Sequence, residues 1–398
     1  MQCPSASRVG VLITHGTDTL EWTHAFLRYA VKNNHANIVL TGSQIPLPGH
    51  PEFSDAYENL ENSLRFMVEL VPPNILTVFN YGEDAFSDSL RKINRWGNIA
   101  FVGDRVARME CDEVREHDSS IGLSTPCKME KLYLITTGGT IEAEETSEGV
   151  LVPGRNHVLS YIAGRFSDYF QDLCTRSPFA IDSSDLTCIR LRKLASLVVR
   201  CLKETNPSAY ADLFEENVRI VYTDPFKKRE EYEKEVDGAS GVVIAGYGGG
   251  NLPMNASRSS IMMPVVREPI RKHIPVVLSS QVPLGVADYV HANGFKPISS
   301  GVFSGVDLSL PECQVRLSYV LGHRNALEQR VEQEGIDFLP LIESLFMSGM
   351  KFRTRRSRMV YEKLRGRRFA QDDLLVGRPF DVALDCACQT SCKEGNSL

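Results

Sequence analysis

The sequence predicts an α/β protein built on parallel sheets, and two observations carry that prediction. Short segments that are continuously apolar and rich in Val and Ile match strands covered on both faces of a parallel sheet. They read RVGVLITH, ANIVLTG, NILTVFN, KLYLITT, VRIVYT, GVVIAGY and IPVVLSS. Between several of them lie helical stretches, at 19–33, 56–70 and 191–204. Alternation of this kind is typical of the α/β class.

The size and composition of the chain allow two or three packed domains. It has 398 residues, of which 42% are hydrophobic, and a net charge of -6. That charge gives no reason to expect nucleic acid as a partner. Residues 1–10 carry no apolar run of signal-peptide length, and no later stretch approaches the roughly 20 apolar residues that span a bilayer. We therefore expect a cytoplasmic protein with no membrane partner.

The cysteines predict reduced thiols and no disulfide framework, because the 10 cysteines lack a regular spacing. Cys386, Cys388 and Cys392 form the only cluster, CACQTSC. Three thiols with a distant fourth ligand could hold a metal ion. Their position at a polar chain end favours a loose tail with free thiols, and we expect neither a metal nor a cofactor.

Breaks in the pattern divide the chain. The polar segment 109–130 reads as a linker, and a further break falls near 206–216. After His323 the pattern becomes helical and then basic, from Lys351 to Arg368. That run is either a phosphate-contacting surface or, as we favour, a solvated helix face or tail. We expect the segment after Met350 to add little to a core.

Candidate chemistry gathers where two apolar strands end, since open parallel sheets bind ligands at the carboxyl ends of their strands. In TTGGT, Gly138 and Gly139 permit a turn that presents Thr140. In THGTDT, Gly16 does the same for Thr17 and Asp18. One glycine after a strand indicates only a turn, but two such turns that each end in threonine indicate hydroxyl chemistry.

A threonine hydroxyl attacks a carbonyl carbon only if a nearby base removes its proton. Lys92, in SLRKINRW, is the candidate base, because burial lowers the pKa of a lysine. The alternative for a lysine in so polar a loop is a solvated surface charge.

These motifs resemble those of the bacterial-type L-asparaginase and glutaminase family, especially its cytoplasmic branch. TTGGTI resembles the first-strand motif of the family, IDSSDLT its substrate loop, and GVLITHGTDTLEWT with IVLTGSQIPL its central motif. SDAYENLENS and SLRKINRWGNIAF continue the match. GVVIAGYGGGNLP, IPVVLSSQVPLG and SSGVFSGVDLSLPECQVRLSYVLG resemble its smaller carboxy-terminal domain. The likeness covers residues 8–322.

The order of the motif blocks departs from the family. The HGTDT block, 9–108, stands ahead of the block 131–204, which carries the first-strand motif and the substrate loop. Each motif occurs once, so the resemblance implies a permuted order. We expect an asparaginase-like domain over 1–207, with its two blocks joined by linker 109–130. A smaller asparaginase-like domain should follow over 208–323, and a helical and basic tail, partly disordered, over 324–398.

The resemblance also implies a mechanism and its residues. Thr140 would be the nucleophile in hydrolysis of a side-chain amide, with Thr17, Asp18 and Lys92 as a second polar set and Lys92 as proton acceptor. The site residues for an amino-acid substrate would be Asp18 at the α-amine, Ser183 and Ser184 at the α-carboxylate, and Asn251 from the smaller domain. On spacing alone, helix capping explains Ser183 and Asp185 equally well. Homo-oligomers, dimers or tetramers, are expected.

One position departs from the family in a way that bears on rate. The mobile loop after the first motif usually carries a tyrosine, and here Val150 stands at that position. The nearest tyrosine downstream is Tyr161, so either another residue, such as Thr146 or Glu145, enters the site, or acylation is slow. A partner-subunit acid has no clear counterpart around 288–294. The resemblance therefore predicts an L-asparaginase-like amidohydrolase of low activity.

Two other classes of function stay open at this point. One is a catalytically inactive asparaginase-like binding or scaffold protein. The other is the glutamine-hydrolysing subunit of a tRNA-dependent amidotransferase, which the basic run would suit. Asparagine and glutamine differ by one methylene, worth only about 1 to 3 kcal/mol in a binding pocket, and the sequence does not decide between them.

Overall fold

The computed structural model divides the chain into two compact units, Met1–Asp212 and Leu213–Leu398. The residues that the structure describes are 9–32, 34, 36–48, 54–69, 75–79, 85–92, 101–105, 128–152, 154, 156–203, 209–254, 259–282, 287, 292–348 and 361. Three regions lie outside the described residues: the linker up to residue 127, the cysteine cluster, and the basic run except for Tyr361.

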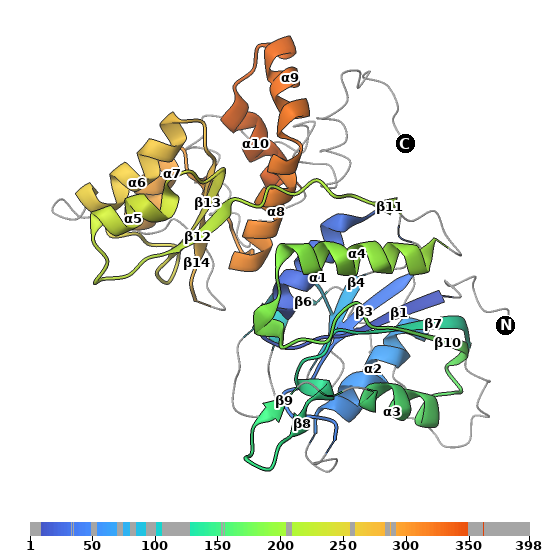
Figure 1. Ribbon diagram of the computed structural model, residues 1–398. Helices are drawn as coiled ribbons and strands as arrows, with labels where there is room; N and C mark the ends of the chain where they lie inside the picture. The colour runs from blue at the N-terminus through green and yellow to red at the C-terminus, as the bar shows by residue number, and fades with distance from the viewer. Residues whose placement is uncertain are drawn as a thin grey trace, which may run out of the picture. The chain divides into compact units, whose positions relative to one another are not determined.

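A seven-stranded sheet organises the first unit (Figure 1). Its order is β10 (Phe170–Arg176), β7 (Met129–Thr136), β1 (Val9–Thr14), β3 (Asn37–Thr41), β4 (Ile75–Val78), β5 (Ala85–Lys92) and β6 (Phe101–Arg105). The pairs from β10 to β4 are parallel, and β5 and β6 are added antiparallel. The expected α/β class with a parallel sheet is confirmed.

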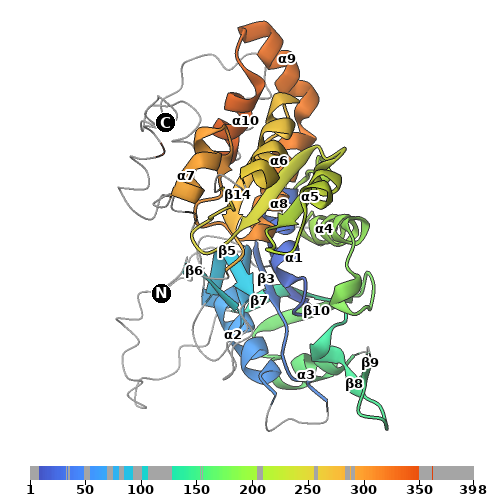
Figure 2. The ribbon, with the colours of Figure 1, turned by 90° about the vertical axis from the view of Figure 1, so that its left-hand side faces the viewer.

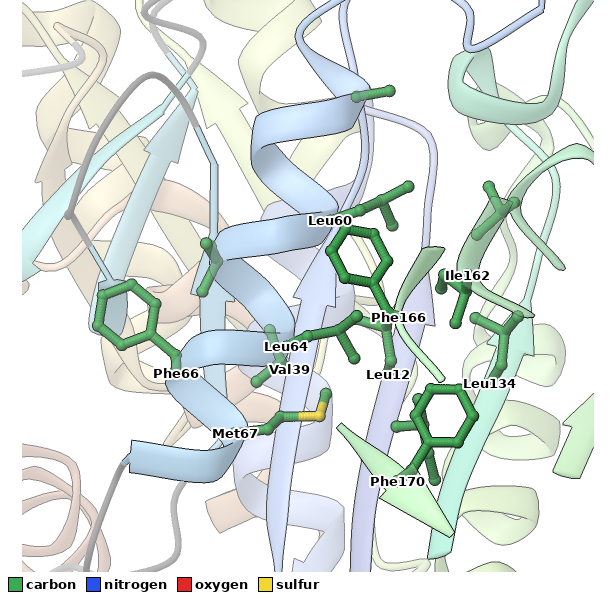
Figure 3. Close-up of a cluster of buried hydrophobic side chains, with 14 of the residues drawn as sticks. Leu12, Val39, Leu60, Leu64, Phe66, Met67, Leu134, Ile162, Phe166 and Phe170 are labelled. Atoms are coloured by element: carbon green, nitrogen blue, oxygen red, sulfur yellow. The ribbon is translucent and has the colours of Figure 1, made fainter. Parts of the chain in front are cut away.

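Helices cover both faces of this sheet, which is why its central strands are apolar throughout. On one face lie α1 (Leu20–Ala30) and α4 (Cys188–Leu202), and on the other lie α2 (Ala56–Glu69) and α3 (His157–Arg165) (Figure 1). The core beneath α2 and α3 joins Leu64 and Met67 of α2 to Leu12 and Leu134 of the strands (Figure 3). Phe170 closes the cluster from the edge strand β10.

Two short pairs complete the first unit. β8 (Glu144–Glu145) and β9 (Leu151–Val152) form a hairpin that projects beside α3 in both ribbon views (Figures 1 and 2). β2 (Val31–Lys32), directly after α1, pairs antiparallel with β11 (Ala209–Tyr210). That pairing ties residues 209–212 to the first unit, which therefore extends beyond residue 207.

The second unit holds a four-stranded, all-parallel sheet in the order β12 (Val218–Tyr222), β13 (Gly241–Gly246), β14 (Val276–Ser280) and β15 (Phe303–Ser304). The helices α5 (Arg229–Val236) and α6 (Ser259–Arg271) pack together on one face, and α8 (Leu310–Gly322) covers the other (Figure 1). α7 (Ala292–Ser299) connects β14 to β15.

The helices after residue 323 are part of the second unit. α9 (Arg324–Glu334) is followed by α10 (Phe338–Met347), and α10 packs on α8. The side chain of Tyr361 is fully buried, and its hydroxyl donates a hydrogen bond to Glu343 of α10. The expectation that the segment after Met350 adds little to a core is therefore wrong at Tyr361. No helix among the described residues is long and apolar enough to cross a bilayer.

Some elements differ from those that the apolar pattern predicts. The helix predicted over 191–204 begins earlier, at Cys188, because Thr187 caps it by accepting a hydrogen bond from Arg190 N. The strand β10 is not predicted at all. Only one side of this edge strand is paired, and its exposed positions are polar, so an apolar run does not mark it.

We expect Tyr361→Ala to lower the free energy of unfolding by about 3–5 kcal/mol, because it empties a fully buried site. Tyr361→Phe, which keeps the ring and removes the bond to Glu343, should cost about 1 kcal/mol. Urea unfolding followed by circular dichroism measures both. Phe226→Ala, at a side chain that is 91% exposed, is the aromatic control and should change little. Equal effects at the two positions would contradict the role of Tyr361.

Candidate active site

The strands β7, β1 and β3 end together at one edge of the first sheet. They are parallel neighbours, with Thr136 opposite Thr14 and Thr14 opposite Thr41. The turn after β7 leads to the short 3-10 helix η2 (Thr140–Glu142). The turn after β1 carries Thr17 and Asp18. The two threonine turns thus leave adjacent strands on the same edge of the sheet.

A glycine in each turn lets the two turns touch. A Cβ added to Gly139 would lie 2.4 Å from Gly16 Cα, and one added to Gly16 would lie 2.4 Å from Ser183 Oγ. Gly138 and Gly139 also have positive φ angles, 89° and 84°, which favour glycine. Thr140 and Thr17 are the next residues after these touching glycines, and both are half-buried. The contact brings together the two turns that carry them.

Lys92 reaches the same place from the end of β5. Its Nζ lies 2.6 Å from Asp18 Oδ1 and 3.4 Å from Thr17 Oγ1. The side chain of Lys92 is 19% exposed, against 56% for Asp18. The backbone N–H of Lys92 donates to the carboxylate of Glu21, on α1. Lys92 is thus a strand residue with fixed partners, and the description of it as part of a polar loop is wrong.

Ser183 joins this group through the 3-10 helix η3 (Ser183–Asp185). It is buried, and its Oγ accepts a hydrogen bond from Asp18 N at 3.2 Å. Its carbonyl oxygen accepts a hydrogen bond from Thr19 Oγ1 at 2.7 Å. Four residues expected from the sequence, Thr17, Asp18, Lys92 and Ser183, are therefore linked directly.

Ser184 is placed differently. It is exposed, and both its N–H and its hydroxyl donate to Asp182 Oδ1 at 2.8 Å. These two hydrogen bonds hold the pKa of Asp182 below its usual range. Asp182 is the residue that caps η3, and Thr187 caps α4. Asp182 and Thr187 are therefore the residues that cap these helices, and the alternative that Ser183 and Asp185 are capping residues is wrong.

His15 is a site residue that the sequence reasoning missed. It is fully buried between the strand ends, where Nδ1 lies 2.7 Å from Gly16 O and Nε2 lies 2.9 Å from Thr23 Oγ1. Nδ1–H donating to the carbonyl leaves Nε2 to accept from the hydroxyl. Burial lowers the pKa of His15 from 6.5 to about 4, because the charged ring would lose its hydration. The neutral ring supports the carbonyl of Gly16, where the two turns touch.

The loop after β3 is a second feature that the sequence reasoning missed. Asp55 accepts hydrogen bonds from Gln44 N and Ile45 N at 3.0 and 3.1 Å and from Asn59 Nδ2 at 3.2 Å. Burial nonetheless raises the pKa of this carboxyl. Leu47 N donates to Ile141 O at 3.2 Å, so the loop is tied to η2. A pattern of apolar residues does not predict a buried carboxylate that binds the backbone of a loop in this way.

Glu142 anchors the other end of η2. Its carboxylate accepts hydrogen bonds from His157 N and Val158 N at 2.9 and 3.3 Å, at the amino end of α3. Asn156, the N-cap residue of α3, makes no side-chain capping bond, so Glu142 does this from another segment. The carboxyl is buried, which raises its pKa. The threonine turn is thereby held at both ends.

In the hairpin that carries Val150, the hydroxyl of Thr146 accepts a hydrogen bond within the turn. Val150 is 54% exposed, its carbonyl accepts from Thr146 N, and its N–H donates to Thr146 Oγ1 at 3.2 Å. Thr146 Oγ1 is therefore engaged in the hairpin turn itself. Tyr161 packs edge-on against Tyr57 and Phe166, with ring centroids 4.8 and 5.5 Å away. Tyr161 belongs to the apolar core around α2 and α3.

Asn251 lies in the second unit, in a tight turn after β13. Its N–H donates to Tyr247 O at 2.8 Å, and Tyr247 N donates back to Asn251 O at 2.9 Å. Its Oδ1 is buried and accepts no hydrogen bond in the described part of the chain. Among the described residues, no group of His, Cys, Asp and Glu is arranged to hold a metal ion.

Comparison with known proteins gives two family matches. Residues 4–118 match the model "Asparaginase, N-terminal", and residues 217–333 match "Glutaminase/Asparaginase C-terminal domain". An L-asparaginase of Thermococcus kodakarensis is 23% identical over 321 residues, covering 80% of this chain and 72% of the relative. The structure of the thermostable L-asparaginase from the same organism superposes with a TM-score of 0.50 at 20% identity, covering 85% of this chain and 74% of that one.

Two further relatives carry other names. The 60 kDa lysophospholipase of Mus musculus is 23% identical, and the match covers 86% of this chain but only 47% of that protein. One subunit of the glutamyl-tRNA(Gln) amidotransferase of Methanobrevibacter smithii is 34% identical over 113 residues, 28% of this chain and 24% of the relative.

His15 predicts a loss of stability in mild acid. Its pKa is lowered on folding, so its contribution is fully present above pH 6.5 and is lost as the pH falls toward 4. The whole effect amounts to about 3 kcal/mol. The raised pKa values of Asp55 and Glu142 have the opposite effect, because they make the folded protein more stable as the pH falls. The contribution of His15 is therefore measured as the difference between a His15 variant and the wild type. Urea unfolding at pH 7 and pH 4.5 should show a smaller fall in His15→Gln than in the wild type, and an equal fall would contradict the prediction.

Proposed function

The chain belongs to the asparaginase family, and we propose that it releases ammonia from the side-chain amide of L-asparagine. The observation that supports this proposal is the contact between the two glycine turns. One turn leads to Thr140, and the other carries Thr17 and Asp18, which are linked to Lys92 and Ser183. A hydroxyl, an amine and a carboxylate at one sheet edge are the parts that nucleophilic amide hydrolysis requires.

In the proposed reaction Thr140 Oγ adds to the amide carbon and its proton passes to a base. Lys92 is proposed as that base, with Thr17 as the relaying hydroxyl, since 3.4 Å separates Nζ from Thr17 Oγ1. The ammonium that results is stabilised by Asp18, 2.6 Å away. The proton returns to the departing nitrogen, ammonia leaves, and water cleaves the acyl-enzyme by the same route.

Substrate recognition in this proposal uses groups around the same turns. The exposed carboxylate of Asp18 would bind the α-amine, and the Ser183 hydroxyl with the turn amides would bind the α-carboxylate. Ser184, already bonded to Asp182, would contribute through the turn that it stabilises. Asn251 is proposed as the contribution of the second domain. No cofactor enters the scheme, and we expect a cytoplasmic homo-oligomer.

The permuted block order is part of the proposal. Two observations support it: β7, from the later block, pairs in parallel with β1 over Val9–Thr14, and the amino-terminal family match ends at residue 118, before β7 begins. The order of connection does not prevent neighbouring strands from pairing within one sheet. Thr140 and Thr17 would then meet within one chain.

The 34% identity to one subunit of an amidotransferase favours a second candidate, hydrolysis of glutamine for a partner enzyme. An inactive binding protein is the third candidate. Assays with free asparagine and glutamine separate the enzyme from the binding protein, and copurification of RNA would favour the amidotransferase.

Thr140→Ala should reduce ammonia release from asparagine to background, because it removes the nucleophile. Lys92→Met should lower kcat by about 10² to 10⁴, the usual contribution of a general base. Coupled detection of ammonia measures both. Thr175→Ala, at an exposed residue of β10, is the control and should be as active as the wild type. Full activity in Thr140→Ala would show that another residue is the nucleophile, and absence of aspartate binding in calorimetry would favour the binding protein.

Val150→Tyr should raise kcat more than it changes KM. The missing tyrosine would act on acylation, where proton transfer is worth a factor of about 10² to 10⁴, whereas the contacts with the α-amine and α-carboxylate come from Asp18 and Ser183. Steady-state kinetics with asparagine separates the two constants. Val150→Phe is the matched control, since it adds the ring without the hydroxyl. A gain of equal size in both variants would assign the effect to packing.

A further inference from the structure

We propose that the carboxamide of Gln44 is a catalytic group that donates a hydrogen bond to the oxyanion formed on the substrate, an inference that rests on the proposed function. Gln44 Nε2 is buried, and among the described residues it has no hydrogen-bond partner. A buried amide donor without a protein partner is rare in folded proteins, and a bound ligand can supply the acceptor that such a donor needs.

The position of Gln44 follows from the ladder between β1 and β3. The ladder continues past the strand ends, because His15 N donates to Thr41 O at 2.8 Å. The next residue, Gly42, lies so close to His15 that an added Cβ would be 2.3 Å from His15 O. Gln44 follows Gly42 by two residues and Thr17 follows His15 by two, so a continued parallel course of the two chains would set these positions side by side.

The strand order sets the loop with Gln44 and the turn with Thr140 on opposite sides of β1. β1 lies between β7 and β3, so the turn with Thr17 lies between the turn with Thr140 and the loop with Gln44. When Thr140 Oγ bonds to the amide carbon, the π electrons of the carbonyl move onto its oxygen. In this proposal Gln44 donates a hydrogen bond to that oxygen from the side of β1 that lies away from Thr140.

Hydrogen bonds hold the described backbone next to Gln44. Asp55 accepts from Gln44 N and Ile45 N, Ser54 Oγ donates to Ile45 O at 2.9 Å, and Asn59 Nδ2 donates to Gly42 O at 2.9 Å. The backbone on both sides of Gln44 is therefore fixed before substrate binds. Donors held in place before the reaction stabilise a developing charge without the cost of reorganising them.

A hollow in the second unit does not identify a ligand in the same way. A hollow of about 530 Å³ in the second unit is lined by Phe226, Lys228, Glu230 and Tyr247 among others. Its cations and carboxylates are mixed, and Lys227 and Arg229 are already paired with Glu235 and Glu233. That lining selects no class of ligand. Gln44 differs because its unpartnered atom is a donor, and a donor requires an acceptor on the substrate.

The test compares Gln44→Met with the wild type, using the full chain and L-asparagine. Methionine has a similar length but no donor, so kcat should fall by about 10² to 10³ while KM and the affinity for L-aspartate stay within a few fold. Gln44→Asn, which keeps the amide but withdraws it, should lose part of that rate. Gln171→Met, at an exposed residue of β10, is the matched control and should keep the wild-type kcat.

The outcomes separate the two proposals. An active wild type with an unchanged kcat in Gln44→Met overturns the role of Gln44 and leaves the proposed function intact. A rise in KM alone also overturns it, because it would assign Gln44 to ground-state binding. If Gln44→Met fails to fold by circular dichroism, Gln44→Glu takes its place, and its acceptor-only carboxylate should lower kcat at least as far. A wild type that releases no ammonia from asparagine or glutamine overturns both proposals.

Discussion

The proposed site in the first unit depends on one backbone contact, the packing of Gly139 against Gly16. With a Cβ on Gly139 the turn after β7 could not approach Gly16 Cα, which would lie at 2.4 Å. Gly16 in turn leaves room for Ser183 Oγ. The proposed approach of Thr140 to the polar group around Thr17 depends on this contact, and so does every chemical role proposed for them.

Around this contact the protein uses buried polar groups as supports. His15 is held neutral beneath the turn after β1, Glu142 ties η2 to α3, and Asp55 clamps the loop after β3. Burial disfavours the charged form of each of these groups, which lowers the pKa of the histidine and raises the pKa of both carboxyls. The supports therefore have an energetic cost, and what they achieve is a fixed geometry at one sheet edge.

Two features of the chain bear on the proposals. Val150 occupies the tip of a hairpin where the resemblance places a tyrosine, and the hydroxyl of Thr146 is already bonded within that hairpin. The block with HGTDT precedes the block with TTGGT, yet their strands pair in parallel. The first feature bears on the rate of the proposed reaction, and the second on how the chain is connected around an ordinary parallel sheet.

The sequence by itself determined the class of the fold, its central strands and the two glycine turns, because apolar runs and glycine preferences are local properties of the chain. It also indicated the residues at those turns, through their resemblance to a family. Only the tertiary structure decided the rest. The partnership of Lys92 with Asp18 joins residues 74 positions apart, and the edge strand β10 owes its conformation to pairing with β7 rather than to its polar side chains. His15 and Tyr361 are buried by the packing of segments against one another, and no local pattern records such packing.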